Sequence, residues 1–253
     1  MKVVFIGSGN VATHMSRAFK AGGHTVLQIW SPTFAHAAIL ATDVEANPIQ
    51  NLSEISLEAD LIVISVKDDA ITNVVSQLAN TNSLVVHTSG AADLDVLTNL
   101  KRRGVLYPLQ TFSKGKVLDF KRVPLCIEAG DAESLAILER LAKSLNNAVY
   151  FVDSAKRHIL HLAATFACNF VNQLYTLSND LLKQNELDFN LLRPLIKETA
   201  EKVQHLSPID VQTGPAIRRD EKTLYAHLEM LQDRPELKNI YQTLSDSIKK
   251  SHQ

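Results

Sequence analysis

The residues with the clearest chemical potential lie near the N-terminus, in a glycine-rich turn. The turn follows the apolar run VVFIG, opens a helical pattern that reaches about Ala21, and consists of Gly7, Ser8, Gly9, Asn10, Val11 and Ala12. In this GxGxxA spacing Gly7 permits a tight turn, Gly9 lets a pyrophosphate approach the backbone, and Ala12 lets helix and strand pack closely. The helix N-terminal amides would then face the phosphates. The motif predicts a dinucleotide-binding loop, and the alternative is a glycine-rich structural turn.

The end of the next expected strand bears on which dinucleotide binds. An acidic residue about 20 residues past such a loop accepts from the ribose 2′-hydroxyl of NAD and would repel the 2′-phosphate of NADP. No carboxylate precedes Asp43, whereas the hydroxyls of Ser31 and Thr33 could donate to a 2′-phosphate. NADP is therefore favoured, and NAD stays open because no Lys or Arg lies between residues 20 and 67. Ser31 and Thr33 could equally cap the following helix.

The residues after two later strands could complete the binding site of the cofactor. Ligands of open parallel sheets collect at the carboxyl ends of the strands, so we expect contacts there to ribose and nicotinamide, mainly from the backbone. Lys67 could instead be a solvated surface residue. A further strand end, Tyr107 to Phe112, could close the site from the other side. The candidate residues of the two strand ends are Ser65, Val66, Lys67, His87, Thr88 and Ser89.

A second polar set lies on a long apolar helix expected from Asp153, its N-cap, to about Gln184. At 100° per residue four polar positions would share one quadrant of this helix, and they are His161, Thr165, Asn169 and Asn172. We predict that His161 donates or accepts the catalytic proton, that Asn169 orients the substrate and that Thr165 binds it. The alternative is a hydrogen-bond network between helices. No metal site is expected, because His158 and His161 have no nearby third ligand.

A third candidate region is the loop Thr213 to Asp220, in which a Gly-Pro pair fixes a rigid turn. Thr213, Arg218 and His227 are predicted to bind substrate, and Asp220 is a candidate catalytic residue. Asp220 could instead be a plain N-cap of the next helix. Arg218 and Asp220 could also hold a subunit interface.

The elements that must position these residues divide the chain into two halves, an α/β domain 1–152 and a helical domain 153–253. Four of the apolar runs in the first half are apolar at nearly every position and do not alternate with polar residues. Strands that are buried on both faces require this pattern. We therefore expect a doubly wound, largely parallel sheet followed by an all-helical C-terminal domain. The long apolar helix should form the core of that second domain, alone or shared with another subunit. The expected strands are Val3 to Ile6, Thr25 to Trp30, Leu61 to Val66, Leu84 to His87, Val105 to Tyr107, Pro124 to Glu128 and Ala148 to Val152, and the later helices are Phe189 to His205, Asp220 to Leu231 and Pro235 to Lys250.

Composition excludes several other classes of protein. The 253 residues are 45% hydrophobic and 21% charged, with a formal net charge of -1, so the chain should fold and has no field that would attract nucleic acid or an anionic membrane. Cys126 and Cys168 have no CxxC spacing, which argues against a disulfide framework or a zinc site. No signal peptide or membrane span is expected. A cytoplasmic protein fits best.

Six segments, read in order, resemble a family of Rossmann-like proteins with a helical C-terminal domain of unknown function: MKVVFIGSGNVATHM, DLIVISVKDDAI, HTSGA, YPLQTFS, KRHILHLAATFACNF and TGPAIRRD. The resemblance covers essentially the whole chain. The family is similar in architecture to pyrroline-5-carboxylate reductase, the deazaflavin-dependent NADP oxidoreductases and the β-hydroxyacid dehydrogenases. It implies a Rossmann-type, NADP-linked oxidoreductase, usually dimeric through the helical domain, with no settled substrate. Besides the dinucleotide loop, the matching positions are His161, Asn169, Thr213, Gly214, Pro215, Arg218, Asp220 and His227.

Two positions depart from these related families. The β-hydroxyacid dehydrogenases carry a catalytic Lys one turn before an Asn on the long helix, whereas Thr165 precedes Asn169 here. Pro32 stands where related NADP users often have Arg. The leading hypothesis is an NADP-dependent oxidoreductase acting on a small carbonyl, imine or hydroxy compound between the domains. We expect it to form a homodimer through the helical domain, as the resemblance implies. The competing hypotheses are a non-catalytic dinucleotide-binding sensor or scaffold, and an enzyme whose hydride comes from a deazaflavin.

Overall fold

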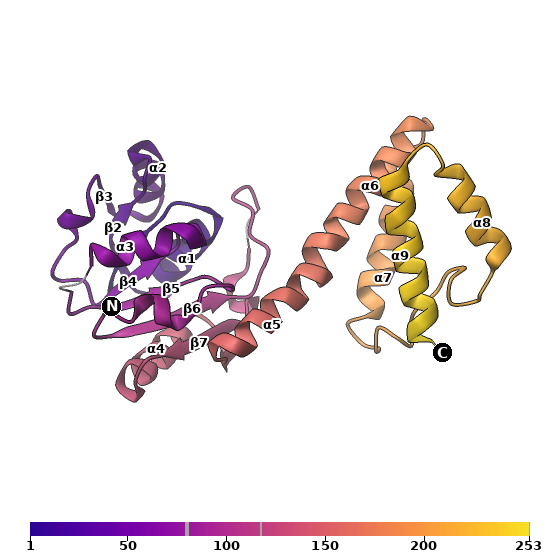
Figure 1. Cartoon of the computed structure of the whole chain (residues 1–253). Helices are drawn as coiled ribbons and strands as arrows, with labels where there is room; N and C mark the ends of the chain where they lie inside the picture. The colour runs from indigo at the N-terminus through magenta and orange to yellow at the C-terminus, as the bar shows by residue number, and fades with distance from the viewer. Residues whose placement is uncertain (79–80, 117, 253) are drawn as a thin grey trace. The chain divides into compact units, whose positions relative to one another are not determined.

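The computed structural model describes residues 1–78, 81–116 and 118–252. The chain divides into two compact units, Met1–Asn169 and Phe170–Gln253. In Figure 1 the first unit runs from indigo to salmon and contains the sheet, and the second runs on to yellow and is helical in its described part.

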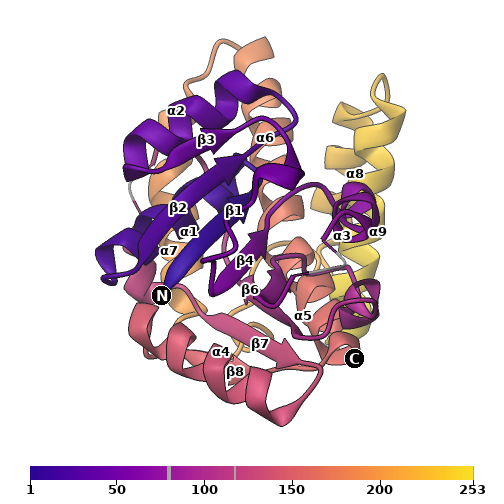
Figure 2. The same cartoon turned by 90° about the vertical axis from the view of Figure 1, so that its left-hand side faces the viewer.

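An eight-stranded sheet forms the centre of the first unit, in the order β3-β2-β1-β4-β5-β6-β7-β8 (Figure 2). Neighbouring strands pair in parallel except β6 and β7, which are antiparallel. The predicted largely parallel sheet is thus confirmed. The strand β3 was not predicted, because three residues that include a proline carry little strand signal, although an edge strand tolerates Pro48. The strands are β1 (Lys2–Ile6), β2 (Thr25–Trp30), β3 (Asn47–Ile49), β4 (Leu61–Ile64), β5 (Leu84–His87), β6 (Arg103–Pro108), β7 (Leu125–Ala129) and β8 (Val149–Phe151).

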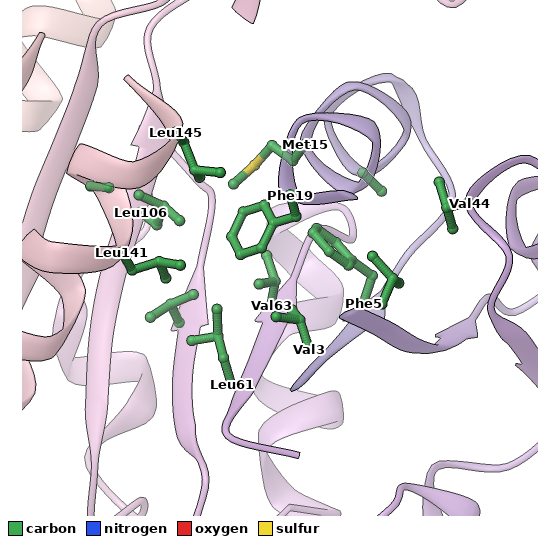
Figure 3. Close-up of a cluster of buried hydrophobic side chains, with 14 of the residues drawn as sticks. Val3, Phe5, Met15, Phe19, Val44, Leu61, Val63, Leu106, Leu141 and Leu145 are labelled. Carbon is green, nitrogen blue, oxygen red and sulfur yellow. The ribbon is translucent and has the colours of Figure 1, made fainter. Parts of the chain in front are cut away.

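Helices cover both faces of this sheet. On one face, alternate strand residues such as Val3 and Phe5 pack against α1 (Asn10–Ala21), α2 (Phe34–Val44) and α4 (Ala132–Leu145), as Figure 3 shows. The rings of Phe5 and Phe19 meet edge to face with their centroids 5.3 Å apart. Burying each such side chain contributes about 1.5–3 kcal/mol.

The opposite face has its own apolar clusters. Val4 and Ile6 pack there with α3 (Ile71–Ser76) and the short helix η3 (Leu94–Leu97). Further along this face, Tyr107 and Cys126 pack against Leu160 of the helix α5 (Ser154–Ala164). The sheet is therefore doubly wound, as predicted. The remaining short helices of this unit are η1 (Leu52–Glu54), η2 (Asp68–Ala70) and η4 (Phe120–Arg122).

The long helical segment after β8 begins as predicted but changes its winding. The Asp153 carboxylate accepts a hydrogen bond from the Lys156 amide at 2.8 Å and caps α5. A π-helical turn, η5 (Thr165–Phe170), then precedes α6 (Val171–Gln184). The prediction of uninterrupted 100° spacing is therefore wrong over this turn, because a π-helix has more residues per turn than an α-helix.

In its described part the second unit holds α6, three further α-helices and one short helix, and it buries little apolar surface. Its described buried apolar side chains are Ala216, Leu224 and Leu231, whereas Leu195 is 66% exposed. No residue of α6 is buried, so the prediction that the long helix forms a buried core is wrong for a single chain. The other elements are η6 (Phe189–Leu191), α7 (Arg193–Lys202), α8 (Glu221–Met230) and α9 (Pro235–Ser251). In the described part of the chain, no helix has both the length and the apolar character needed to cross a membrane.

Candidate functional site

The glycine-rich turn has the geometry of a phosphate loop. Gly7 has φ +125°, and a Cβ there would lie 2.2 Å from the carbonyl oxygen of Ser65. Only glycine therefore fits where β1 and β4 end side by side. A Cβ on Gly9 would meet nothing within 4 Å, so no protein atom of the described residues fills the space beside this residue.

The N-terminus of α1 is available to an anion. Its N-cap is Gly9, no side chain caps it, and its first turn contains no acidic residue. The first amides of an α-helix lack intrahelical acceptors and carry partial positive charge. The amides from Asn10 to Ala12 thus combine an open approach with the electrostatics that a pyrophosphate requires.

Ser31 and Thr33, the two residues predicted to contact a 2′-phosphate, follow the end of β2. The Ser8 hydroxyl donates to the Ser31 hydroxyl at 2.8 Å, and both side chains are buried. Thr33 occupies the N-cap position of α2, but its side chain makes no capping hydrogen bond and the residue is exposed. Neither Ser31 nor Thr33 therefore caps α2 with its side chain, which was the alternative to a role in cofactor binding. Ser31 retains its own proton for donation.

The ends of β4 and β5 are tied together by hydroxyl groups. The Ser65 and Thr88 side-chain oxygens lie 3.1 Å apart in buried positions. Val66 packs against the apolar cluster on one sheet face. Lys67 is exposed, as a solvated surface residue would be.

His87 and Ser89 organise the loop after β5. The His87 ring is fully buried, and its Nδ1 accepts from the Ser89 amide while Nε2 faces the Asp93 carbonyl, each at 3.2 Å. Burial, together with the nearby Arg157 charge, lowers the pKa of His87 to about 4. The ring is therefore neutral, with its proton on Nε2. The Ser89 hydroxyl accepts from the two amides of Ala91 and Ala92, so it holds the turn after β5 and keeps its own proton for donation.

Sequence reasoning placed Tyr107 in a strand end that could close the site, but it gave this residue no role of its own. Its hydroxyl lies 3.0 Å from His161 Nδ1, and the two rings meet edge to face with centroids 6.0 Å apart. Tyr107 is 8% exposed, and burial raises the pKa of its phenol to about 12. The polar strand end YPLQTFS was the available signal, but nothing in it indicated a partner 54 residues away.

Gly90 makes room for this pair. A Cβ at Gly90 would lie 2.6 Å from His161 Nδ1 and 2.9 Å from Tyr107 Cζ. Real Cβ atoms do not approach other atoms so closely, hence any larger residue would push one ring away. The loop after β5 thus helps to hold the Tyr107–His161 pair.

A small cavity of about 130 Å³ opens beside the Tyr107–His161 pair. It brings together three residues predicted from the sequence, His161, Thr165 and Asn169, of which Thr165 donates to the His161 carbonyl at 3.1 Å. None of the described residues lining it is a carboxylate, a lysine or an arginine. The other lining residues are Tyr107, Leu109, Gln110, Thr111, Ala164 and Cys168.

The loop after β6 connects this cavity with the dinucleotide loop. Gln110 and Thr111 line the cavity, while the next carbonyl, that of Phe112, accepts from the Asn10 side chain at 2.9 Å. His14 Nε2 lies 3.0 Å from the following carbonyl. Two adjacent stretches of one loop therefore contact the cavity and the start of α1.

A buried cation fixes the helix that carries His161. Arg157 lies one turn earlier, is fully buried, and pairs with Glu128 of β7. Its other terminal nitrogen donates to the Ala92 carbonyl and to the Ser154 hydroxyl. Since these partners belong to β7, to the loop after β5 and to α5 itself, Arg157 fastens the first turn of α5 to the sheet.

The histidines of α5 have other partners than a metal. His158 Nε2 lies 3.6 Å from an Asp93 carboxylate oxygen, and His161 faces Tyr107. Across the residues that the structure describes, no group of three or more His, Cys, Asp or Glu side chains could hold a metal ion. Cys126 and Cys168 are both free thiols.

The candidate residues of the second unit have mainly structural contacts. Asp220 caps α8: its carboxylate accepts from the Thr223 amide and hydroxyl, and these bonds lower its pKa. This is the capping alternative, and a catalytic role stays a prediction. His227 Nδ1 lies 2.7 Å from the Tyr241 hydroxyl, beside an open cavity of about 780 Å³. Thr213 and Arg218 are exposed, and their role in substrate binding also stays a prediction.

Comparisons with known proteins identify both parts of the chain. Residues 1–112 match the model of a Rossmann-like domain, and residues 123–248 match a domain of unknown function, DUF2520. A crystal structure from Bacteroides fragilis, provisionally named an NADP oxidoreductase, is 42% identical, covers 98% of each chain and has a TM-score of 0.93. The chain belongs to this family of Rossmann-like proteins with a DUF2520 domain. The resemblance read from the sequence is thereby confirmed.

More distant solved structures are similar to this chain in fold alone. An imine reductase from Myxococcus stipitatus in complex with NADP+ is 16% identical with a TM-score of 0.64, over 99% of this chain and 92% of that one. A 1-pyrroline-5-carboxylate reductase from Streptococcus pyogenes is 15% identical with a TM-score of 0.67, over 100% and 98%. No match to the sequence was found among curated proteins.

Proposed function

We propose that this DUF2520 protein is an NADP-dependent oxidoreductase acting on a small carbonyl, imine or hydroxy compound. The observation that carries the proposal is that an open, uncapped phosphate loop and a polar cavity belong to one unit and are joined by one loop, through Thr111 and Phe112. The names of the relatives support it, since one is provisionally named an NADP oxidoreductase and another is an imine reductase in complex with NADP+.

The residues that would hold the dinucleotide follow from the strand ends. The amides after Gly9 suit the pyrophosphate, and Ser31 and Thr33 suit a 2′-phosphate. Backbone groups at the ends of β4 and β5 would contact the ribose and nicotinamide. When bound, the nicotinamide supplies or accepts a hydride, and the protein's part is to orient the substrate and move a proton. Asn169 and His161 are the residues proposed for that part.

A matched pair of glycine variants tests the cofactor site. Gly9→Ala adds a methyl group that meets no protein atom, so the fold should persist while the phosphates are kept away. Gly115→Ala adds the same methyl group to a loop position that is equally open. Titration with NADPH and NADH, followed by nicotinamide fluorescence and by the thermal midpoint, should show at least about 10-fold weaker binding for Gly9→Ala only, because bound ligand raises the midpoint by mass action.

The same titration tests the dinucleotide preference. Wild type should bind NADPH more tightly than NADH, and Thr33→Asp should reverse this order because a carboxylate repels the 2′-phosphate. Equal binding by Gly9→Ala and wild type, or binding of neither dinucleotide, would contradict the proposal. NADPH binding without consumption of any carbonyl, imine or hydroxy substrate would favour a dinucleotide-binding sensor instead.

A further inference from the structure

Tyr107 and His161 form a short hydrogen-bonded chain that leads from a buried position to an exposed one. The Tyr107 side chain is 8% exposed, whereas His161 is exposed to solvent. Their bond joins the phenol oxygen to Nδ1 at 3.0 Å. An imidazole can take up a proton at one nitrogen and release one at the other. The pair therefore has the connections of a proton relay between solvent and a hydroxyl at the cavity wall.

The wall of the cavity indicates what kind of molecule can react there. Its described polar groups are hydroxyls, side-chain amides, a thiol and an imidazole, and it has neither a carboxylate nor an arginine or lysine. A substrate carboxylate or phosphate would lose its hydration without a cationic partner, which is unfavourable. An iminium ion would equally lack an anionic partner. A neutral polar group such as a carbonyl can be bound by the amides of Gln110 and Asn169.

We propose, on the basis of the oxidoreductase function above, that the substrate is a neutral aldehyde or ketone, or the corresponding alcohol. In this reaction the Tyr107 hydroxyl is the catalytic proton donor to the carbonyl oxygen. His161 is the positioning residue that holds this hydroxyl and restores its proton.

The step balances with a reduced nicotinamide dinucleotide as the hydride source. As the carbonyl carbon gains the hydride, the π electrons move to oxygen, which takes the Tyr107 proton: one phenol O–H bond breaks and one alcohol O–H bond forms. The tyrosinate takes the proton of His161 Nδ1 while Nε2 takes one from solvent, so the ring stays neutral, and exchange with solvent then restores the Nδ1–H form. The raised pKa of Tyr107, about 12, keeps the phenol protonated at neutral pH, and it remains a stronger acid than the alcohol formed.

The first test concerns the relay and does not need turnover. In the full chain with NADPH bound, ¹⁵N spectra of the histidine ring nitrogens, with His161→Gln to assign the signals, report which nitrogen of His161 carries the proton. Tyr107→Phe should change the tautomer balance of His161, because the Nδ1 partner is lost. Tyr150→Phe is the matched control, since Tyr150 is a 54% exposed residue of β8. Unchanged His161 signals in Tyr107→Phe would overturn the relay.

The second test follows NADPH oxidation with cyclohexanone, benzaldehyde, pyruvate and 2-methyl-1-pyrroline. Wild type should reduce a neutral carbonyl compound. Tyr107→Phe should lower kcat by at least about 100-fold, the usual scale for a general acid, with NADPH affinity within about twofold of wild type. Tyr150→Phe should keep full activity.

His161→Gln should flatten the pH profile of kcat, and added imidazole should restore part of its activity if the ring supplies protons. A normal pH profile in this variant, or full turnover by Tyr107→Phe, would overturn the assigned roles. The proposed class of neutral carbonyl substrates would be overturned if a protein that binds NADPH reduced only pyruvate or the pyrroline. Reduction of none of the four compounds by such a protein would overturn it as well. Failure of wild type to bind NADPH would instead overturn the proposed function itself.

Discussion

Removing the Glu128 carboxylate should strongly destabilise the first unit. Arg157 is 0% exposed and Glu128 is 17% exposed, so water cannot readily replace the lost partner. The Ser154 hydroxyl, which donates to the same carboxylate at 2.8 Å, loses its acceptor too. Breaking a buried ion pair on one side costs about 3–5 kcal/mol, because a charge is left buried and unpaired. Glu128→Ala should therefore lower the free energy of unfolding by about 3–5 kcal/mol.

Glu139→Ala is the matched control, because it also removes one glutamate from an ion pair of the first unit. Glu139 pairs with Lys143 on the surface of α4, and the two side chains are 32% and 60% exposed. A surface pair of this kind contributes at most about 1 kcal/mol. The two variants thus delete the same group, a glutamate carboxylate, from ion pairs that differ in burial.

Urea unfolding followed by the fluorescence of Trp30 measures this difference. Trp30 is the single tryptophan and lies in β2, so its signal reports on the first unit. With a urea m-value of about 2 kcal/mol/M, Glu128→Ala should lower the midpoint by about 1.5–2.5 M, and Glu139→Ala by less than about 0.5 M. Equal shifts in the two variants would refute the argument from burial. Glu128→Leu combined with Arg157→Met should recover most of the loss, because apolar replacement of a whole buried pair is nearly neutral.

Two further predictions concern pH and assembly. The pKa of His87 is about 4 in the folded protein and 6.5 in the free group. As the pH falls from 6.5 to 4, the unfolded chain therefore binds a proton at His87 that the folded chain does not bind. The free energy of unfolding of the wild type should fall by up to about 3 kcal/mol over this range. His87→Gln should flatten this part of the pH dependence of the urea midpoint, and an unchanged slope would contradict the role of His87. We also propose that the second unit pairs with a second copy, since Leu195 and Leu206 are 66% and 56% exposed. Sedimentation should then show a wild-type dimer that Leu195→Glu weakens, and a monomeric wild type would count against it.

Features that depend on neighbouring residues were predictable from the sequence. Short-range patterns in the sequence were enough to predict the glycine-rich turn and seven of the strands. They were also enough to predict the helix caps at Asp153 and Asp220. Apolar runs without alternation also required a sheet covered on both faces. For that reason the fold class could be predicted from the sequence, and the resemblance of its motifs indicated the family.

The tertiary structure alone decided which distant groups meet. Tyr107 and His161 lie 54 residues apart, and Arg157 and Glu128 lie 29 apart, and no local periodicity encodes such pairings. Gly90 looks like an ordinary loop glycine in the sequence, yet its missing Cβ is what gives the two rings their space. The π-helical turn of Thr165–Phe170 likewise changes the helix face that regular spacing would give. The sequence by itself determined most of the strands and helices and the glycine-rich turn. Packing between elements determined the cavity, because a contact between distant segments depends on how whole elements fit together.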